Sequence, residues 1–293
     1  VLALFFNFLA LYLIITRSRK AIGSYKYLLI AFLCNDVVFS VVHQLCQPVL
    51  SFRGGFFVSY GEGLVDSSFV LTLYGAAGSL AFPLLAYHFM YRAYVVSRHC
   101  SPRLQNWRHS RKVAVLLGAF LLLEAGVWVF FNYQLRLDPS DGRIRATIAA
   151  AHPNLANRTE LIAIVPFIND ELNVRVAWAA CPLLAIAGSS FVCIIAAAFK
   201  ITYALYIHTT TSLSSIAIHK RMFIALIIQM LVPTLTMIAP SMAAISLPFL
   251  PRVSIDIPDW LIGTCYSLYP LLDPIVITLC IRDYRWGLYQ LLR

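Results

Sequence analysis

The sequence has 293 residues, of which 60% are apolar and only 12% are charged. Soluble domains carry roughly 25% charged residues, so this composition excludes an ordinary soluble domain and predicts a helical membrane protein. A net charge of +10 would suggest a nucleic-acid partner in a soluble protein, but in a membrane protein it must first be compared with the charge of the loops.

Apolar runs of about 20 residues recur along the chain and are too long for the strands of an outer-membrane barrel. They predict an all-α bundle of seven membrane-spanning helices that forms a single membrane domain over residues 1–293. Because the first residue is the apolar Val1, we expect the sequence to be truncated, with segments missing at both ends. The predicted spans cover about residues 1–16, 27–46, 67–91, 113–134, 176–199, 222–247 and 260–281.

Basic residues are concentrated in alternate connections between these runs. The connections after the first, third and fifth runs, together with the tail, hold 16 Lys and Arg residues and one acid, Asp283. The other three connections hold seven Arg and nine acidic residues, and none of the five Lys. Cytoplasmic loops are the basic ones, so we expect the N-terminus outside and the C-terminus in the cytoplasm. The basic excess therefore indicates topology, and nucleic acid is excluded as a partner.

The longest connection, residues 135–175, lies on the predicted outer side and contains the sequon Asn157-Arg158-Thr159. Asn157 is therefore a predicted glycosylation site. A connection of this length either forms a lid over a site or is a solvated surface loop, and the sequence leaves both open. Cys46 and Cys181, near the outer ends of spans, are the one pair of the seven Cys considered for a disulfide, which the sequence does not decide.

Three carboxylates, Asp36, Glu124 and Asp273, lie inside predicted spans, where an ionisable group is costly and marks a functional site. Counted from Lys26 and Arg282, Asp36 and Asp273 lie about 15 and 14 Å from the inner surface. At this common depth they either share a proton, a sodium ion or water, or are hydrogen-bonded separately. Glu124 either faces a ligand cavity or bonds within the bundle.

Two prolines, Pro270 and Pro274, flank Asp273 in the last span and free backbone carbonyls that neighbouring groups must satisfy. Tyr284 follows Asp273 by eleven residues, which places it on the same helix face and about 16 Å further along. One face of this helix would thus link a mid-membrane charge to the cytoplasmic end.

Enzyme chemistry finds little support in the sequence. His43 and His88 lie on different spans, and no His pair has the spacing of a zinc-binding helix. Gly188-Ser189-Ser190 lacks the pattern of a nucleophile elbow. The last span has no Lys for a retinal Schiff base. We therefore expect no enzyme, no metal and no cofactor.

Three motifs lie in the third, sixth and seventh spans. They are His88-Phe89-Met90-Tyr91-Arg92-Ala93-Tyr94, then His219-Lys220-Arg221 followed by Leu226-x-x-Gln229-x-x-x-Pro233 and Ala239-Pro240, and finally Pro270-x-x-Asp273-Pro274 with Ile281-Arg282-Asp283-Tyr284-Arg285. These motifs resemble those of the nematode serpentine chemoreceptors of the Str superfamily, nearest the Str and Srj groups. Rhodopsin-like receptors differ, because Tyr91-Arg92 replaces an acid-Arg-Tyr triplet and Ile277 replaces the Tyr of N-P-x-x-Y.

The resemblance implies a G-protein-coupled olfactory-type receptor in the plasma membrane of sensory cilia. Such a receptor binds a small odorant-type ligand in the outer half of the bundle and activates a heterotrimeric G protein. Depth and side-chain type suggest as ligand-binding residues Thr72, Tyr74, Trp178, Met237 and Tyr266. The expected intramembrane switch or ion site comprises Asp36, Asp273, Pro233 and Pro274. The expected G-protein-facing residues are Tyr91, Arg92, Tyr94, Lys220, Arg221, Tyr284 and Arg285.

Two alternatives remain open at this point. A channel or an ion- or proton-coupled transporter would use Asp36, Glu124 and Asp273 as an ion path. The absence of a visible internal repeat argues mildly against a transporter. A receptor-like scaffold that binds no ligand is the second alternative.

Overall fold

The structure is a computed structural model. It describes residues 1–18, 25–100, 111–138, 140–155, 157–168, 171–207, 213–250 and 256–293. Within these ranges the side chains of residues 98–100, 111–114, 207 and 213–222 are not described.

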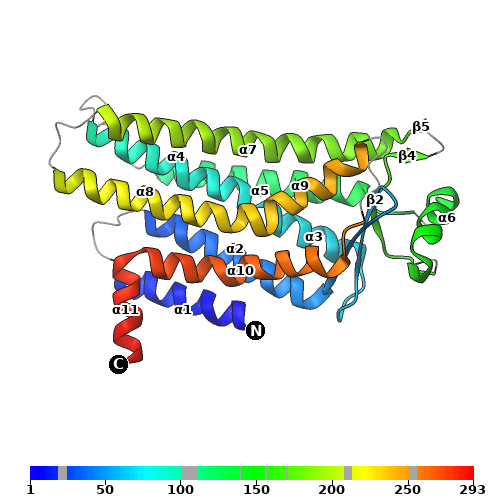
Figure 1. The fold of residues 1–293 in the computed structure, drawn as a ribbon, viewed down its shortest axis with the longest axis horizontal. Helices are drawn as coiled ribbons and strands as arrows, with labels where there is room; N and C mark the ends of the chain where they lie inside the picture. Colours follow the sequence, from blue (N-terminus) through cyan, green and yellow to red (C-terminus); the bar gives the residue numbers. More distant parts are fainter. Residues whose placement is uncertain are drawn as a thin grey trace.

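Long helices lie side by side along the long axis of the molecule (Figure 1). The expected all-α fold needs a correction, because two small sheets lie at one end of the helices. The helices are α1 (Leu2–Arg17), α2 (Tyr25–Cys46), α3 (Ser68–Ser79), α4 (Ala81–Cys100), α5 (Arg111–Gln134), α6 (Gly142–Ala151), α7 (Val174–Ile207), α8 (Leu213–Pro233), α9 (Ala239–Ser246), α10 (Asp259–Cys280) and α11 (Arg282–Leu292). Short turns are η3 (Pro153–Leu155), the π-helical η4 (Thr234–Ile238) and η5 (Leu247–Phe249).

Within the described ranges, six helical stretches are long and apolar enough to cross a membrane. Two of them combine several elements, since α3 and α4 form one stretch and α8, η4 and α9 form another. The first helix, α1, is apolar but has only 16 residues, which is shorter than a usual span. Six of the predicted seven spans are thus long enough, and α1 as a span stays a prediction.

Prolines shape two of these helices differently. Helix α8 ends at Pro233, and the chain continues as the π-helical turn η4. A proline has no N–H and crowds the preceding turn, which favours such a local change. In α10, Pro274 leaves the carbonyl of Pro270, four residues earlier, without its helical donor. Asn7 of α1 donates to that oxygen at 2.7 Å, so α1 completes the hydrogen bonding of α10.

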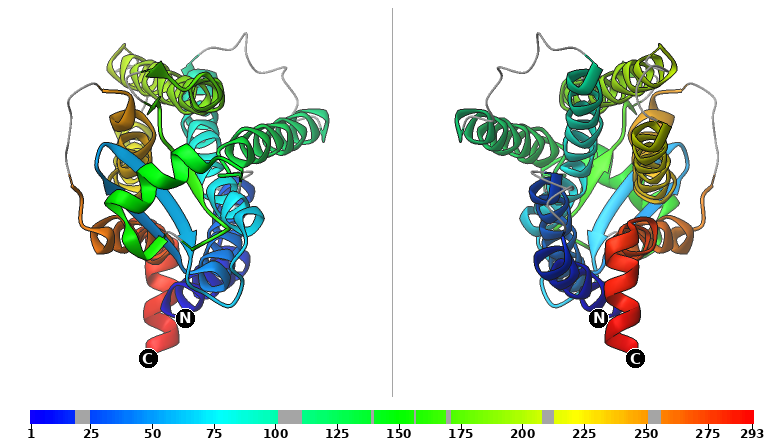
Figure 2. Two further views of the ribbon diagram at one scale, coloured as in Figure 1. Left: turned by 90° about the vertical axis from the view of Figure 1, so that its right-hand side faces the viewer. Right: turned by 90° about the vertical axis from the view of Figure 1, so that its left-hand side faces the viewer.

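A three-stranded antiparallel sheet of β1 (Pro48–Arg53), β2 (Phe56–Gly61) and β3 (Ile162–Ile164) lies across the end of the bundle (Figure 2). Strands β1 and β2 form a hairpin whose tip holds Gly54 and Gly55, with φ of 63° and 79°. Positive φ at two successive positions is the requirement of a tight two-residue turn, which glycine meets without strain. The second sheet pairs β4 (Phe167–Ile168) with β5 (Glu171–Leu172).

The two faces of the hairpin pack against different parts of the molecule. Side chains of one face, including Leu50 and Phe57, belong to the main core between the helices. Side chains of the other face, including Phe56 and Val58, pack with Ile148 of α6 in a separate small core. Successive side chains along a strand point to opposite faces of the sheet, which explains why the two sets pack in different cores. Helix α6 therefore lies outside the sheet, as Figure 2 shows.

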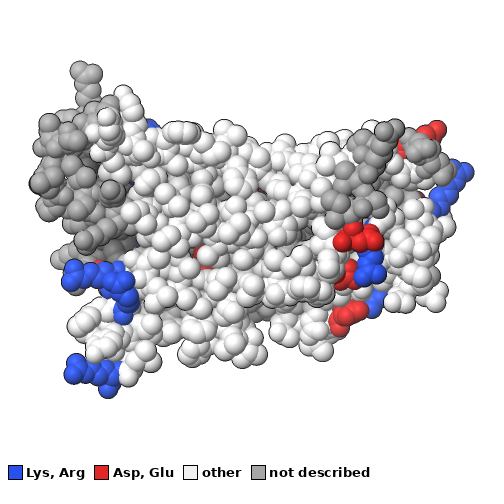
Figure 3. Space-filling model, in the orientation of Figure 1, with Lys and Arg blue, Asp and Glu red and all other residues white. Residues whose placement is uncertain are grey.

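Helix α11 turns away from α10 and packs against α1 (Figure 1). The Tyr284 hydroxyl lies 2.9 Å from that of Ser18, and Arg17 donates to Gln290 at 2.9 Å. On the face shown in Figure 3, charged side chains gather at the two ends of the molecule, and the middle is nearly free of them. This distribution matches a chain that crosses a membrane along its long axis.

Candidate functional site

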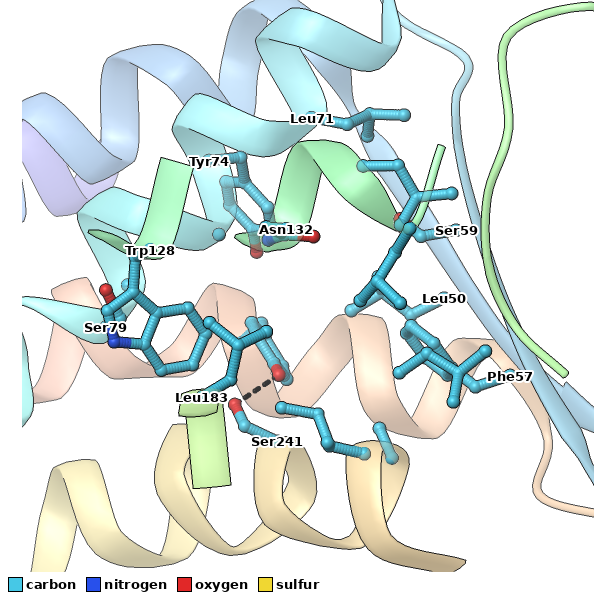
Figure 4. A pocket seen from close by; sticks show the side chains of 18 of the residues that line it. Leu50, Phe57, Ser59, Leu71, Tyr74, Ser79, Trp128, Asn132, Leu183 and Ser241 are labelled. Carbon is cyan, nitrogen blue, oxygen red and sulfur yellow. Dashed lines mark hydrogen bonds between the residues drawn. The ribbon is translucent and has the colours of Figure 1, made fainter. Parts of the chain in front are cut away.

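A cavity of about 90 Å³ lies where the sheet meets the helices (Figure 4). Its walls come from the hairpin, from α3, α5, α7 and α10, and from the segment η4–α9. Elements far apart in the sequence thus converge on one space. The side chains that carry the argument below are Leu50, Phe57, Ser59, Tyr74, Trp128, Asn132, Met237, Ser241 and Tyr266.

The lining contains aromatic and aliphatic groups, a few hydroxyls and one amide, but none of its residues is charged. Ser241 and Tyr266 are hydrogen-bonded to each other, and the dashed line in Figure 4 marks this pair. The Tyr74 hydroxyl lies 3.2 Å from Nδ1 of His43. An apolar space with a few fixed polar groups suits a small neutral molecule. A charged ligand would lose its hydration here without gaining an opposite charge.

Two glycines of α3 let its neighbours approach the cavity. A Cβ at Gly75 would collide with the Asn132 amide nitrogen of α5. At Gly78, a Cβ would lie 3.2 Å from the Phe39 ring and 3.4 Å from the sulfur of Met237. The missing side chain at Gly75 therefore decides where the Asn132 amide lies, and with it one polar contact of the cavity.

The structure brings together three of the five predicted ligand-binding residues, Tyr74, Met237 and Tyr266, in the cavity wall. Thr72 does not line the cavity; its hydroxyl donates to Ser68 O at 2.8 Å within α3. Two residues along a helix turn the side chain by about 200°, so Thr72 and Tyr74 face opposite ways. Trp178 is 54% exposed, packs on phenylalanines of α5 and is also absent from the wall.

Sequence reasoning missed the other polar and aromatic wall residues, including Ser59 of the hairpin, Trp128 and Asn132 of α5, and Ser241 of α9. The adjacent Gly54-Gly55 was the signal for the hairpin, because such a pair between apolar runs favours a tight turn. Part of the long connection also contributes, since Ile162 and Ile164 of β3 line the cavity. Of its two interpretations, the lid therefore describes this segment better.

Asp36 of α2 and Asp273 of α10 come together in the middle of the bundle, as their similar predicted depths allow. Both are buried, and their carboxyl groups interact electrostatically with each other and with Tyr269. Their oxygens make no hydrogen bond of standard geometry among the described residues, although the two carboxyl groups and the Tyr269 hydroxyl lie within reach of one another. Asn35 donates to Ala77 O at 3.0 Å. This arrangement favours a carboxylate pair over two separately bonded acids.

Glu124 lies apart from this pair, on α5. Its side chain is 7% exposed, and it interacts electrostatically with Tyr87 of α4. The three intramembrane acids are thus divided between two places, and no group of three His, Cys, Asp or Glu suited to a metal occurs in the part of the chain that the structure describes.

At the end opposite the sheet, the Arg92 guanidinium of α4 lies 4.0 Å above the Tyr25 ring of α2. The Tyr25 hydroxyl lies 3.1 Å from Nδ1 of His88, and its ring stacks on Tyr91. A cation over an aromatic face is an attractive contact, stronger when water is excluded. Arg92 is 8% exposed, so this contact is shielded.

The predicted G-protein-facing residues differ in exposure. Tyr284 is fully buried against α1, and its hydroxyl lies next to that of Ser18. Arg92 is nearly buried, because its guanidinium lies over the Tyr25 ring between the helices. Neither can touch a partner in this arrangement without movement. Arg285 is exposed and donates to Leu279 O at 3.2 Å. Tyr91 and Tyr94 are partly exposed on α4, whereas the side chains of Lys220 and Arg221 lie outside the described residues.

Two further predictions, and one further contact, concern the sheet end. Cys46 and Cys181 are both free, so the structure contains no disulfide between them. Asn157 is exposed next to the sheet, where a glycan would meet no obstacle from burial, and its glycosylation stays a prediction. Glu160 accepts a hydrogen bond from the backbone N–H of Ser68 at 2.9 Å, at the start of α3. Hydrogen bonding from the Ser68 side chain, together with this backbone contact, lowers the pKa of Glu160.

Comparison with known proteins places this geometry in a family. The model of the family "Serpentine type 7TM GPCR chemoreceptor Str" matches residues 1–289. The serpentine receptor class r-10 of Caenorhabditis briggsae is 24% identical, over 97% of this chain and 85% of the relative. Its namesake in Caenorhabditis elegans is 25% identical, over 98% and 86%. The G-protein coupled receptor str-33 of Caenorhabditis elegans is 24% identical, over 99% and 87%.

The match covers nearly the whole chain and includes all three motifs that indicated the resemblance. It is a receptor family and not an enzyme family, it supports a chemosensory role, and it does not favour a channel or a transporter. The chain belongs to the Str family of serpentine seven-transmembrane G-protein-coupled chemoreceptors.

Proposed function

We propose that this protein is a chemosensory receptor that binds a small neutral molecule in the cavity beneath the β1–β2 hairpin. The single observation that carries the proposal is the uncharged lining of that cavity. Tyr74, Asn132 and the Ser241–Tyr266 pair offer hydrogen bonds at its edges, while Trp128 and Phe57 offer apolar contact. An odorant-type molecule is neutral, as this lining requires, and the volume of about 90 Å³, well below the roughly 300–1,000 Å³ of drug-sized ligand pockets, calls for a small one.

Ligand binding would act through the Ser241–Tyr266 contact, which joins α9 to α10. Ser241 lies just beyond η4, and Tyr266 lies seven residues, about two turns, before Asp273. A ligand that separates or tightens this pair therefore shifts α9 relative to α10, with Pro233 and Pro274 as the points where each helix bends. Movement of these helices would expose the inner end and admit a heterotrimeric G protein.

The orientation follows from the loop charges. The sheet end would face outside with the N-terminus, and α11 would lie at the cytoplasmic surface. Plasma membrane, in sensory cilia, is the proposed location, and the lipid bilayer surrounds the helices. Glycosylation at the exposed Asn157 would agree with this orientation.

The proposal is tested by expressing the full chain in cells with a G-protein activation sensor and screening a panel of volatile neutral molecules. We expect a response to some members, with a half-maximal concentration that rises several-fold in Ser241→Ala. The matched control is Ser189→Ala, because Ser189 is exposed on α7 and bonds only its own helix among the described residues. Surface expression is measured in parallel.

If Ser241→Ala and the unaltered chain have the same half-maximal concentration for every active ligand, the cavity is not the ligand site. A ligand-evoked current that persists when G proteins are blocked would instead favour a channel. That outcome would be unexpected, because Glu124 is separate from the Asp36–Asp273 pair and the three acids do not line one path.

A further inference from the structure

The β1–β2 hairpin, residues 48–61, closes the cavity at the sheet end (Figure 2, Figure 4). Leu50, Phe57 and Ser59 form its inner surface. On the outer surface, Phe56 and Val58 pack towards α6. A molecule that approaches the cavity from the sheet end therefore meets the hairpin first.

The open end of the hairpin is fixed to α2 and α3. Only Gln47 separates α2 from β1. The backbone N–H groups of Glu62 and Gly63 both donate to Cys46 O, the last residue of α2, at 3.0 Å. Arg158 donates to Gly61 O at 2.7 Å. Covalent continuity and backbone hydrogen bonds thus hold this base.

The tip of the hairpin reaches across the cavity to the start of α10. Asp259 accepts from the Ser51 hydroxyl at 2.7 Å and from the Arg53 guanidinium at 3.1 Å. The backbone N–H of Gly54 donates to Asp256 at 3.2 Å. Two carboxylates therefore hold three donors of the tip. The backbone N–H of Ile257 adds one hydrogen bond to Phe52 O at 3.0 Å, and the Phe52 side chain is buried.

The base and the tip differ in how strongly they are held. The side chains of Arg53 and Asp259 are 47% and 31% exposed. Ion pairs with this exposure are weak and compete with water and salt. A tight glycine turn moves as a unit, and the segment with exposed polar contacts opens at the lowest cost. Strand β2 stays paired with β3, so the hairpin and β3 move together. The tip, which among the described residues is joined to the segment before α10 by a single backbone hydrogen bond, is the part that separates first.

We propose that the hairpin is a flap hinged at α2 and α3, and that ligand enters and leaves the cavity when the tip is released from Asp256 and Asp259. This inference rests on the proposed function, because it takes the cavity as the ligand site. Asp259 acts as a positioning residue: it touches Ser51 and Arg53 of the flap and does not line the cavity.

Cavity access can be measured without any ligand. The full chain in nanodiscs carries Ser241→Cys as a reporter inside the cavity, and the small neutral reagent methyl methanethiosulfonate is the probe. Peptide mass spectrometry gives the reaction rate at position 241, separately from the native cysteines. We expect Asp259→Ala to raise that rate about two- to fivefold, as release of a weak ion pair allows. The conservative Asp259→Asn should give a smaller rise.

The control for this variant is Asp141→Ala. Asp141 pairs with Arg175 at 3.3 Å, and the two side chains are 31% and 49% exposed, which nearly matches the Arg53–Asp259 pair. This pair does not involve the hairpin, so its loss should leave the rate unchanged. Equal acceleration by Asp141→Ala and Asp259→Ala would contradict the flap.

A reversible lock gives the opposite perturbation. Ser51→Cys with Asp259→Cys places two thiols where the Ser51 hydroxyl now meets the carboxylate. Oxidation should reduce the reaction at position 241 to the background of the chain without the reporter. Reduction, followed by removal of the reductant, should restore it and show that the protein is folded. The reporter chain without the added cysteine pair, oxidised and reduced in the same way, is the control and should keep its rate throughout.

Unchanged access in the oxidised tip-locked protein would show that the probe enters elsewhere, and the flap would be wrong. The same conclusion follows if position 241 stays unreactive in Asp259→Ala. Because the assay needs neither a ligand nor a G protein, the flap can fail while the proposed receptor function stands. Conversely, a ligand screen without any response would count against the receptor and leave these rates untouched.

Discussion

Two polar regions of the bundle differ in how their groups are satisfied. In the cavity, the hydroxyls of Ser241 and Tyr266 are bonded to each other, and that of Tyr74 contacts His43. In the middle of the bundle, the carboxyl groups of Asp36 and Asp273 are buried and face mainly each other and Tyr269. The neutral cavity has an unused donor, the indole N–H of Trp128, which has no partner within the described chain. Such a region is suited to recognising a molecule in a fixed geometry, whereas a buried pair of acids makes the local arrangement easy to change.

Under the proposed function, the difference predicts that the cavity sets ligand sensitivity and that the acid pair sets the balance between states. Changes in the cavity should alter the half-maximal ligand concentration with little effect on basal signalling. Changes near the acids or near Arg92 should alter basal signalling first. The predictions below test this division, beginning with the largest expected effect.

The cavity prediction concerns Gly75→Ala. The added Cβ collides with the Asn132 amide, so Asn132 must leave its position. Overpacking of this kind costs about 1–3 kcal/mol, or roughly 5- to 150-fold in half-maximal ligand concentration. The measurement is G-protein activation against ligand dose. Gly188→Ala on α7 is the control, since a Cβ there meets nothing within 4 Å. A change in basal signalling without a change in ligand sensitivity would contradict the separate roles of the cavity and the acid pair.

The acid pair is tested by Asp273→Asn. The amide can donate a hydrogen bond to Asp36, which stabilises the present arrangement, where Arg92 and Tyr284 are buried. We expect the protein to insert normally and basal signalling to fall about tenfold, equivalent to roughly 1.4 kcal/mol. Glu124→Gln makes the same chemical change away from the pair and serves as the control. If Asp273→Asn leaves basal activity and ligand sensitivity unchanged, Asp273 has only a structural role.

At the end opposite the sheet, Tyr25→Leu removes the ring beneath Arg92. A shielded cation–aromatic contact contributes about 0.5–2 kcal/mol, so basal signalling should rise by roughly two- to thirtyfold. Tyr25→Phe keeps the ring, loses the contact to His88 and should produce the smaller rise. Both are read in the ligand-free activation assay. A larger effect from Tyr25→Phe would show that the hydroxyl, and not the ring, holds this end.

The smallest expected effect is on stability at the outer end. The pKa of Glu160 is lower in the folded protein than in the unfolded chain. The ionised side chain therefore adds to the free energy of unfolding above the unfolded pKa, and this contribution is lost as pH falls through the folded pKa. Glu160→Gln should cost about 0.3–1 kcal/mol at neutral pH and nothing at low pH. Thermal unfolding in nanodiscs at several pH values measures this. Glu171→Gln, on the exposed strand β5, should show no pH-dependent difference.

The sequence by itself determined the helical membrane class, the approximate spans and the family motifs, because apolar length and loop charge are local properties that one chain displays directly. Depth along a helix is also local. For that reason Asp36 and Asp273 were predicted at one level, and Tyr74, Met237 and Tyr266 were predicted at the depth where the cavity lies.

Tertiary structure alone decided which groups meet. Thr72 and Trp178 have suitable depth and chemistry, but their azimuths turn them away from the cavity, and a membrane helix can be apolar on both its lipid-facing and its inner side. The contact of Asn132 with α3 and the support that Asn7 gives to α10 depend on residues distant in the sequence. The cover of the cavity likewise requires a hairpin and a third strand from separate connections, and such non-local pairing leaves little trace in local sequence pattern.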